Sequence, residues 1–314
     1  MKYGFGIDIG GTTVKLAYFD AEGTLLSKWE IPTNKENEGR QILPDIAESV
    51  RKYLDDNKIK DESIIGIGLG VPGAINAEGV VNRCVNLGWG VMNIEKPLAE
   101  LTGFPVKAGN DANVAALGEC WKGGGRGYNS MVMATLGTGV GGGIIIDGKI
   151  LFGVHGAGGE IGHIPFMRGE TIPCGCGKYG CAEQYCSATG IARLAKEMLA
   201  ATGEASSLRA LETITAKDVF TAAGEGDAVA LSITEQYYNY LGEFLATVCS
   251  IIDPEVVVLG GGVCKAGQPL LDGANKYFRQ YVFHGVRDIP FKLAQLGNDA
   301  GAYGAFKLVL DTCG

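Results

Sequence analysis

Residues 3–19 read YGFGIDIGGTTVKLAYF, in which two apolar runs are separated by a pair of glycines. The runs Tyr3–Ile9 and Val14–Phe19 are rich in β-branched and aromatic residues, a composition typical of β-strands. Glycines in such a turn let backbone N–H groups approach an anion closely, and the threonine that follows adds a hydroxyl donor. We therefore predict two strands joined by a phosphate-binding turn, which consists of Gly10, Gly11 and Thr12.

Two later segments repeat this pattern. Gly137-Thr138-Gly139 follows the apolar run Ser130–Leu136, and Gly260-Gly261-Gly262 follows Val256–Leu259. A strand and a hairpin turn at Asp147-Gly148 come after the first of these repeats, as in the N-terminal unit. The repeat indicates an internal duplication, and the first two turns are predicted to form the two halves of a phosphate clamp. The alternative is that all three are hairpin turns without a ligand.

The segment 137–142 also matches the pattern G-x-G-x-x-G, which opens a helix in dinucleotide-binding folds. Here the strand-like run Ile144–Ile146 follows, so the match does not indicate a dehydrogenase. The P-loop pattern G-x-x-x-x-G-K-[ST] does not occur in the sequence.

The composition favours an ordered chain of two domains. With 314 residues and 46% hydrophobic content, the chain can bury a large core. The net charge of −8, with no concentrated basic stretch, argues against a nucleic-acid partner. Gly127–Ile146 is uncharged and about as long as a bilayer requires, but its many glycines favour a strand, a loop and a strand over a membrane span.

The cysteines indicate a reducing compartment. Their number, nine, is odd, and apart from one cluster they are scattered, which is not the pattern of a secreted disulfide framework. The N-terminal apolar run is broken by Asp8 before a signal-peptide core could form. We expect a cytoplasmic protein with no membrane partner.

The one cysteine cluster follows a histidine. Eleven residues after His163 the chain reads Cys174-Gly175-Cys176, and Cys181 completes the cluster. Three thiols and an imidazole fill a tetrahedral zinc shell, and the glycines between them let the loop curl around the ion. We predict a structural zinc, because four protein ligands leave no open coordination position. The alternative is free or disulfide-paired thiols, although a bridge within Cys-x-Cys is strained.

Helical periodicity and glycine stops suggest where the domains divide. Asn110-Asp111-Ala112-Asn113 joins the predicted strand Val106–Ala108 to a helix that stops at Lys122-Gly123-Gly124-Gly125. Taking this stop as a hinge, we predict a small N-terminal lobe at residues 1–121 and a large lobe with the zinc loop at 122–299. A C-terminal helix at 300–314 is expected to pack back on the small lobe.

Taken together and in this order, the motifs resemble those of the ROK family of sugar kinases and repressors. Besides the glycine turns, the match includes Val71-Pro72-Gly73, Asn86-Leu87-Gly88-Trp89, Asn110-Asp111-Ala112-Asn113 and Glu160-x-Gly-His163. It covers nearly the whole chain, and the run Gly180–Tyr185 is most similar to the bacterial glucokinase branch. The resemblance implies an α/β fold with two lobes, the actin-like fold of the hexokinase and heat-shock ATPase superfamily, built from duplicated ribonuclease H-like domains.

The resemblance also implies an activity, the transfer of phosphate from ATP to glucose to give glucose 6-phosphate, with Mg²⁺ and in a homodimer. Two lobes that close on the sugar would exclude water. The residues expected to bind the sugar are Asn86, Asn110, Asp111, Glu160, His163 and Glu183. Those expected to bind the nucleotide are Gly10, Gly11, Thr12, Thr138, Gly139, Gly261 and Gly262.

Three of these side chains have a chemical role and a simpler alternative. Phosphoryl transfer to an alcohol needs a carboxylate to take the proton, and Asp111 is the candidate base, unless it only caps the following helix. Asp8 is expected to hold Mg²⁺ through water, unless it only initiates the turn. One ring nitrogen of His163 could bind zinc while the other donates to the sugar, unless the residue is a zinc ligand alone.

The chain departs from its relatives at one position of the first turn. Thr13 stands where many of them carry a lysine, which leaves open whether Lys15 supplies the missing charge. The repressor branch places a helix-turn-helix before this turn, and none is expected here because the turn begins at residue 8. The alternatives to a glucokinase are a kinase for another hexose or an N-acylated amino sugar and a non-catalytic sugar sensor, which should lack Asp111.

Overall fold

The computed structural model describes residues 2–314, which form two compact units. The first unit contains residues 2–129, Gly143–Gly159 and Gln295–Gly314, and the second contains Ser130–Gly142 and Glu160–Ala294. The predicted lobes and their hinge at residue 122 stay a prediction, since compactness alone does not show which parts move.

A five-stranded sheet with the order β3-β2-β1-β4-β7 forms the centre of the first unit. β1 pairs antiparallel with β2 and parallel with β4, and β4 pairs parallel with β7. The five strands are β1 (Tyr3–Ile9), β2 (Thr13–Asp20), β3 (Leu25–Pro32), β4 (Ile64–Val71) and β7 (Val106–Asn110).

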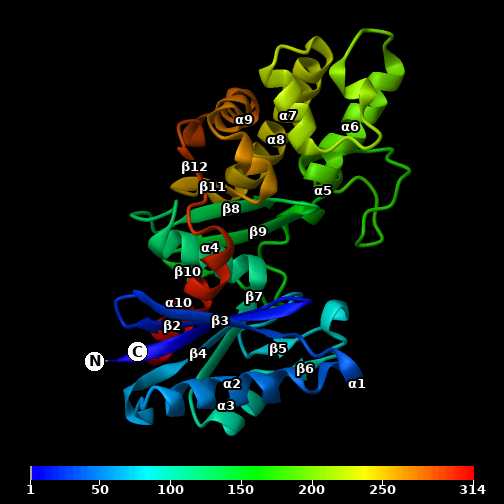
Figure 1. Ribbon diagram of the computed structural model, residues 1–314. Coiled ribbons are helices and arrows are strands. Elements are labelled where there is room, and N and C mark those ends of the chain that lie inside the picture. The colour runs from blue at the N-terminus through cyan, green and yellow to red at the C-terminus, as the bar shows by residue number, and fades with distance from the viewer. Residues whose placement is uncertain (1) are drawn as a thin grey trace. The chain divides into compact units, whose positions relative to one another are not determined.

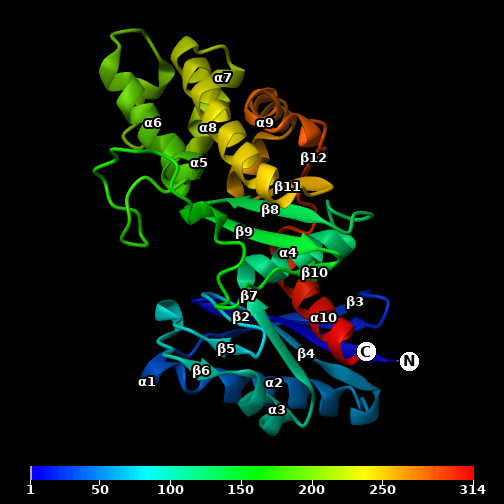
Figure 2. The same ribbon diagram turned by 180° about the vertical axis from the view of Figure 1, so that it is seen from behind.

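Helices cover both faces of this sheet (Figures 1 and 2). α2 buries Ile42, Ile46 and Val50 in a core shared with the strands, and α10 buries Phe306 against Phe19 on the other face. The helices of this unit are α1 (Glu36–Gly39), α2 (Ile42–Asp56), α3 (Glu95–Thr102), α4 (Asp111–Lys122) and α10 (Ala300–Cys313).

Glycines on two strands bring α10 unusually close to the sheet. A Cβ atom on Gly6 of β1 would lie 2.0 Å from the carbonyl oxygen of Ala302, and one on Gly68 of β4 would lie 1.7 Å from that of Ala305. Only glycine fits at such distances. The close packing places the first residues of α10 beside Asp8, at the end of β1.

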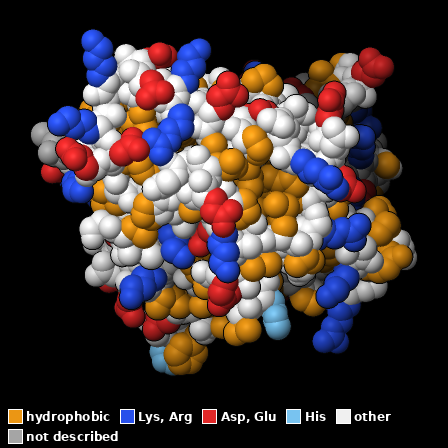
Figure 3. Space-filling model, turned by 90° about the horizontal axis from the view of Figure 1, so that it is seen from below, with side chains coloured by type: hydrophobic (Ala, Val, Ile, Leu, Met, Phe, Trp, Pro, Cys, Tyr) orange, Lys and Arg blue, Asp and Glu red, His pale blue; other side chains and the backbone are white. Residues whose placement is uncertain are grey.

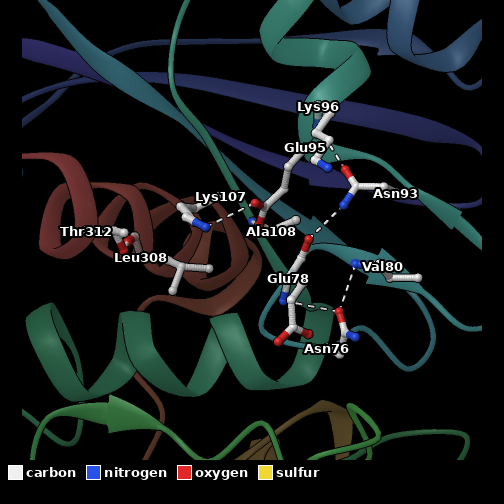
Figure 4. A network of polar contacts seen from close by, with 10 residues as sticks. All are labelled: Asn76, Glu78, Val80, Asn93, Glu95, Lys96, Lys107, Ala108, Leu308 and Thr312. Atoms are coloured by element: carbon white, nitrogen blue, oxygen red, sulfur yellow. Dashed lines mark hydrogen bonds and ion pairs between the residues drawn. The ribbon is translucent and has the colours of Figure 1, made fainter.

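A polar network fixes β7, the strand that leads to Asp111 (Figure 4). Glu95 accepts a hydrogen bond of 3.0 Å from the N–H of Ala108 and pairs with Lys107 at 3.1 Å. The neighbouring hairpin of β5 (Val80–Val81) and β6 (Met92–Asn93) joins the network, because Asn93 donates to the carbonyl of Glu78 at 2.7 Å. Sequence patterns did not predict this short hairpin.

A second sheet has the order β10-β9-β8-β11-β12, which repeats that of the first sheet strand for strand. β11 pairs parallel with β8 and β12, as β4 does with β1 and β7. Its strands are β8 (Met131–Leu136), β9 (Val140–Ile146), β10 (Lys149–Ile150), β11 (Val256–Gly260) and β12 (Phe291–Leu293).

The helices of the second unit pack on one another around α8, which contacts α6, α7 and α9 (Figure 1). They are α5 (Glu183–Cys186), α6 (Ala188–Ala201), α7 (Ala216–Gly224), α8 (Ala228–Ile252) and α9 (Gln268–Tyr281). Tyr237 of α8 is fully buried, and its hydroxyl donates to the carbonyl of Cys186 at 3.0 Å. α8 therefore anchors the segment that follows the cysteine loop.

The matching strand orders confirm the predicted fold class and agree with an internal duplication. The uncharged segment Gly127–Ile146 contains β8 and β9, as predicted. β10 ends at Ile150, and α2 begins at Ile42. A right-handed helix does not begin earlier because Asn37, Glu38 and Gly39, in the short segment α1, have a left-handed backbone.

Two surface properties bear on partners. Among residues 2–314, none of the helices combines the length and apolarity that a membrane span requires. On the face shown in Figure 3, Lys and Arg side chains are interspersed with Asp and Glu and do not form one basic patch.

Candidate active site

The first glycine turn is held by a single threonine. The hydroxyl of Thr33 donates to the carbonyl of Gly10 at 2.7 Å, and its N–H donates to the carbonyl of Thr12 at 2.9 Å. No atom lies within 4 Å of the position that a Cβ on Gly11 would take. The carbonyl oxygens are thus fixed from one direction, while the backbone at Gly11 stays open to an approaching anion.

Asp111 is the first residue of α4, but it does not cap that helix. The N-cap is Asn110, whose side-chain oxygen accepts from the N–H of Asn113 at 3.1 Å. The Asp111 carboxylate accepts from the N–H of Ala112, at 2.8 Å. Burial raises the pKa of Asp111, although this hydrogen bond and the one from Asn110 oppose the shift. Asn110, and not Asp111, therefore caps the helix. The carboxylate of Asp111 can still accept a hydrogen bond from a substrate.

Asp8 lies in a notch between two glycines. A Cβ on Gly301 would be 3.0 Å from the carboxyl carbon of Asp8, and one on Gly70 would be 3.6 Å from its Oδ1. Lys15 is its partner in the β1–β2 register. Burial raises the pKa of Asp8, the charge of Lys15 lowers it, and the charge of Asp111 raises it. The three groups therefore interact electrostatically, and Lys15 supplies a positive charge near the first turn.

The two predicted asparagines of this unit differ in exposure. Asn110 is 7% exposed and donates to the carbonyl of Gly73 at 3.1 Å, whereas Asn86 is exposed on a short 3₁₀ turn, Val85–Leu87. Asn113 donates to the carbonyl of Gly158 at 3.0 Å, but its buried Oδ1 has no partner. Leaving a buried oxygen without a hydrogen-bond donor costs free energy. Oδ1 of Asn113 is therefore a further position at which a ligand or a water molecule can donate a hydrogen bond.

The second glycine turn is held in the same way, by the start of α6. The N–H of Ala188 donates to the carbonyl of Gly137, and the hydroxyl of Thr189 donates to that of Thr138, both at 2.8 Å. Glu183 accepts from the N–H of Val140 at 3.0 Å, and a Cβ on Gly139 would lie 2.1 Å from its Oε2. The segment after the cysteine loop thus shapes this turn. Sequence patterns did not reveal Thr33 or Thr189, because neither is near its turn in sequence.

The third turn lies beside the second. Gly261 has a φ of +87°, and a Cβ there would be 2.5 Å from the carbonyl oxygen of Leu136, so only glycine fits. Gly262 borders a cavity of about 1190 Å³, which is lined by residues of α7, α8 and α9 as well. Three aromatic side chains, Phe220, Tyr238 and Tyr277, are among them. They come from three helices, and no sequence motif could have identified them together.

The four predicted zinc ligands converge. The ligand atoms of His163, Cys174, Cys176 and Cys181 all lie within 4.8 Å of one another. Cys174 Sγ is 3.7 Å from His163 Nδ1, and Cys176 Sγ is 3.6 Å from Cys181 Sγ. Tetrahedral zinc with bonds of about 2.3 Å to sulfur and 2.0 Å to nitrogen requires separations of about 3.5–3.8 Å. The donor set and these two separations fit zinc, and all nine cysteines are free thiols.

Glycines and strand-like bridges shape the loop around these thiols. Gly177 and Gly180 have φ values of +84° and +71°, and a Cβ on Gly180 would lie 1.9 Å from the carbonyl oxygen of Met167.

Burial raises the pKa of Cys174 to about 12 and also raises that of Cys181. For Cys176 burial is outweighed by hydrogen bonds from the Lys178 N–H and the other two thiols, which lower its pKa.

The three predicted sugar-binding residues of this unit surround the thiols. With Nδ1 of His163 directed at Cys174, its Nε2 lies 4.0 Å from the carboxylate of Glu160. Glu183 uses its second oxygen, Oε1, to accept from the thiol of Cys174 at 3.4 Å. His163 thus has one ring nitrogen for the cluster and one outside it, which is the arrangement that a dual role requires.

A polar and aromatic cluster connects the segment before the thiols, which contains Glu170, to α5 and α6. The carboxylate of Glu170 is only 9% exposed, pairs with Arg193 and accepts from the hydroxyl of Tyr185. The guanidinium of Arg193 lies over the Tyr185 ring, 4.6 Å from its centre. The hydrogen bond from Tyr185, with those from Ile172 and Arg193, lowers the pKa of Glu170 to about 2.

We expect this cluster to make stability fall in acid. A carboxylate whose pKa is lowered on folding stabilises the protein above its ordinary pKa of about 4.5, and this contribution is lost as the pH falls toward about 2. Glu170→Gln should therefore remove roughly 1–2 kcal/mol at neutral pH and flatten the pH dependence. Chemical denaturation from pH 6 to pH 3 measures both. The matched control is Glu197→Gln, because the 59% exposed Glu197 lies 3.7 Å from the same arginine. Equal curves for both variants would contradict the prediction.

The chain belongs to the ROK family, whose profile it matches over residues 4–312. It is 46% identical over 311 residues to a glucokinase of Halalkalibacterium halodurans, covering 97% of this chain and 94% of that protein. It is 33% identical to an N-acetylgalactosamine kinase of Shewanella, covering 96% of this chain and 94% of that protein. The structure of a ROK family glucokinase from Streptomyces griseus, in complex with glucose and AMPPNP, superposes with a TM-score of 0.74 at 33% identity and covers 98% of each chain.

Proposed function

We propose that this protein is an ATP-dependent hexose kinase that phosphorylates glucose to glucose 6-phosphate. The observation that carries the proposal is the junction of β7 and α4, where Asn110 caps the helix and leaves Asp111 available as a base. The similarity to glucokinases supports the choice of sugar. In this reaction Asp111 takes the proton of the sugar hydroxyl that attacks the terminal phosphate.

The roles proposed for the other residues of the first unit follow from their surroundings. Asp8, beside Lys15 and Asp111, would hold Mg²⁺ through water, since Mg²⁺ keeps most of its hydration shell. Gly10, Gly11 and Thr12 would offer backbone N–H groups and a hydroxyl to a phosphate. Asn86 and Asn110 would bind sugar hydroxyls.

In the second unit, the nucleotide is assigned to two neighbouring turns and a cavity. Thr138 and Gly139 would contact phosphates, and Gly261 and Gly262 would lie along the adenosine. The cavity beside Gly262 offers aromatic faces for a base, which supports this assignment. Glu160, Glu183 and the outer nitrogen of His163 would bind further sugar hydroxyls.

We also propose that the His163 and cysteine cluster binds one structural Zn²⁺. The ion would add folding energy to a loop that has few apolar side chains of its own. It would also fix the tautomer of His163, leaving an N–H on Nε2 as a donor. A homodimer in the cytoplasm completes the proposal, on the family resemblance alone.

The test is a comparison of kcat/KM across sugars with ATP. Glucose should exceed N-acetylglucosamine, N-acetylmannosamine, N-acetylgalactosamine and fructose by about 10–100-fold. A site that hydrogen-bonds every hydroxyl leaves a buried polar group unpaired when an analogue does not match it. An acetamido group would also have to enter the shell of Glu183 and His163.

A single outcome decides between the two candidate functions. If an acetamido sugar exceeds glucose, the glucose assignment is wrong and the amino-sugar kinase, which the similarity to the Shewanella enzyme favours, replaces it. The role of Asp111 would be unaffected by that result.

A further inference from the structure

A short left-handed turn precedes α2. Asn37 has φ 50° and ψ 48°, Glu38 has φ 62° and ψ 32°, and Gly39 has φ 66°. Two of these three consecutive residues are not glycine, and each such residue costs about 1–2 kcal/mol in this conformation. A protein keeps strain of this kind where the surrounding structure holds it in place, and such places are often functional.

The turn is held by the loop Cys84–Trp89. The indole N–H of Trp89, which is 3% exposed, donates to the carbonyl of Gly39 at 3.1 Å. A Cβ on Gly39 would lie 2.4 Å from the carbonyl oxygen of Leu87, and one on Gly88 would lie 3.2 Å from the Cα of Glu38. The two segments are therefore interlocked. α1, which contains the turn, lies beside the β5–β6 hairpin that carries the loop in both ribbon views (Figures 1 and 2).

The loop is closed at its base and connected to the proposed base, Asp111. Cys84 and Trp89 exchange two backbone hydrogen bonds, of 2.9 and 3.0 Å, which leave Asn86 exposed at the tip. A Cβ on Gly73 would lie 2.9 Å from the carbonyl oxygen of Arg83, and the carbonyl of Gly73 accepts from Asn110. The start of the loop thus packs on Gly73, whose carbonyl oxygen accepts from Asn110. Asn110 directly precedes Asp111 in the chain. Burial raises the pKa of Cys84, and two backbone hydrogen bonds lower it. The charge of Asp111 also raises it, which agrees with a position of Cys84 near Asp111.

We propose that the left-handed turn Asn37–Gly39 clamps the loop Cys84–Trp89, and that Trp89 is a positioning residue that sets Asn86 for sugar binding. The inference rests on the proposed function, in which Asn86 contacts the sugar. The clamp fixes where the loop tip stands relative to Asn110 and Asp111 within the first unit. A loop that is free to move would lose ordering entropy whenever it bound sugar, which would weaken binding.

The test is Trp89→Phe, which keeps an aromatic ring and removes the N–H. We expect KM for glucose to rise about 5–10-fold, as the loss of one buried hydrogen bond allows, with KM for ATP unchanged within twofold. The matched control is Trp29→Phe, which also loses an indole hydrogen bond in the same unit, to Ser49 Oγ at 2.8 Å. Equal changes in KM for glucose in both variants, or a parallel rise in KM for ATP, would overturn the proposal.

A second pair of variants covers the case in which Trp89→Phe does not fold. Glu38→Gly adopts the left-handed backbone without strain, so it should raise Tm and leave KM for glucose unchanged. Gly39→Ala places a methyl group against the carbonyl oxygen of Leu87 and should raise KM for glucose. An unchanged KM in Gly39→Ala would refute the clamp. If the wild type does not phosphorylate glucose, the proposed function fails, and the same variants test the clamp with the sugar that it does use.

Discussion

Asp111→Asn should lower kcat by about 10²–10⁴-fold while the affinity for glucose changes little. Asparagine keeps the size and hydrogen-bonding reach of the aspartate but cannot accept the proton. The helix should not be affected, because Asn110 and not Asp111 caps α4. Steady-state kinetics together with glucose binding by calorimetry separate the loss of turnover from a loss of binding.

Asp45→Asn is the matched control for this prediction. Asp45 is the acidic residue in the first turn of α2, as Asp111 is in that of α4, and it lies in the same unit. It should keep normal turnover. If Asp111→Asn also keeps near-normal turnover, Asp111 is not the base.

The pH profile gives an independent check on the same residue. The base works only as the carboxylate, and burial raises the pKa of Asp111 above its ordinary value of about 3.8. Activity should therefore fall with decreasing pH before an exposed aspartate would be protonated. A kcat/KM that stays flat down to pH 4 would contradict this assignment.

Loss of the proposed zinc should have the second largest effect. We expect about one zinc per chain in protein that is purified without chelator, and Cys176→Ser should lose it. Structural zinc contributes about 10 kcal/mol or more of folding energy to small sites, so the loop between Cys174 and Cys181 should lose its fixed shape without the ion. Because Glu160, His163 and Glu183 border this loop, KM for glucose should rise at least about 100-fold.

Two readouts make this prediction specific. Metal analysis measures the zinc directly, and limited proteolysis reports whether the loop has become accessible. Cys313→Ser, which changes an exposed thiol outside the cluster, should keep its zinc, its protease resistance and its KM. An active preparation that contains no metal would refute the zinc site.

Local patterns predicted the parts of the site that are continuous in sequence. The glycine turns and the cysteine cluster depend on residues a few positions apart, and such short segments have few alternative shapes. The repeat predicted an internal duplication, and the matching strand orders of the two sheets agree with it. The junction at Asn110 and Asp111 was predicted as a strand end and a helix start, but sequence could not tell which of two adjacent residues caps the helix.

The remaining features depend on tertiary contacts. Thr33 and Thr189 hold the first and second glycine turns, yet each is an ordinary threonine in the sequence. The contacts of the left-handed turn Asn37–Gly39 are with the loop that ends at Trp89, which is distant in sequence. The cavity beside Gly262 forms where three helices meet. None of these could be read from periodicity or local propensity.

The packing of α10 has a consequence for the order in which the chain folds. β1 and β4 are made early, but Gly6 of β1 and Gly68 of β4 pack against α10, which follows the second unit in the chain. Most of the second unit, Glu160–Ala294, is one continuous segment that emerges before α10 does. On the ribosome, the second unit can therefore complete its core while the first still exposes a strand surface to solvent. The half of the protein that is translated first is thus the half that finishes folding last, and chaperones have their longest opportunity to act on it.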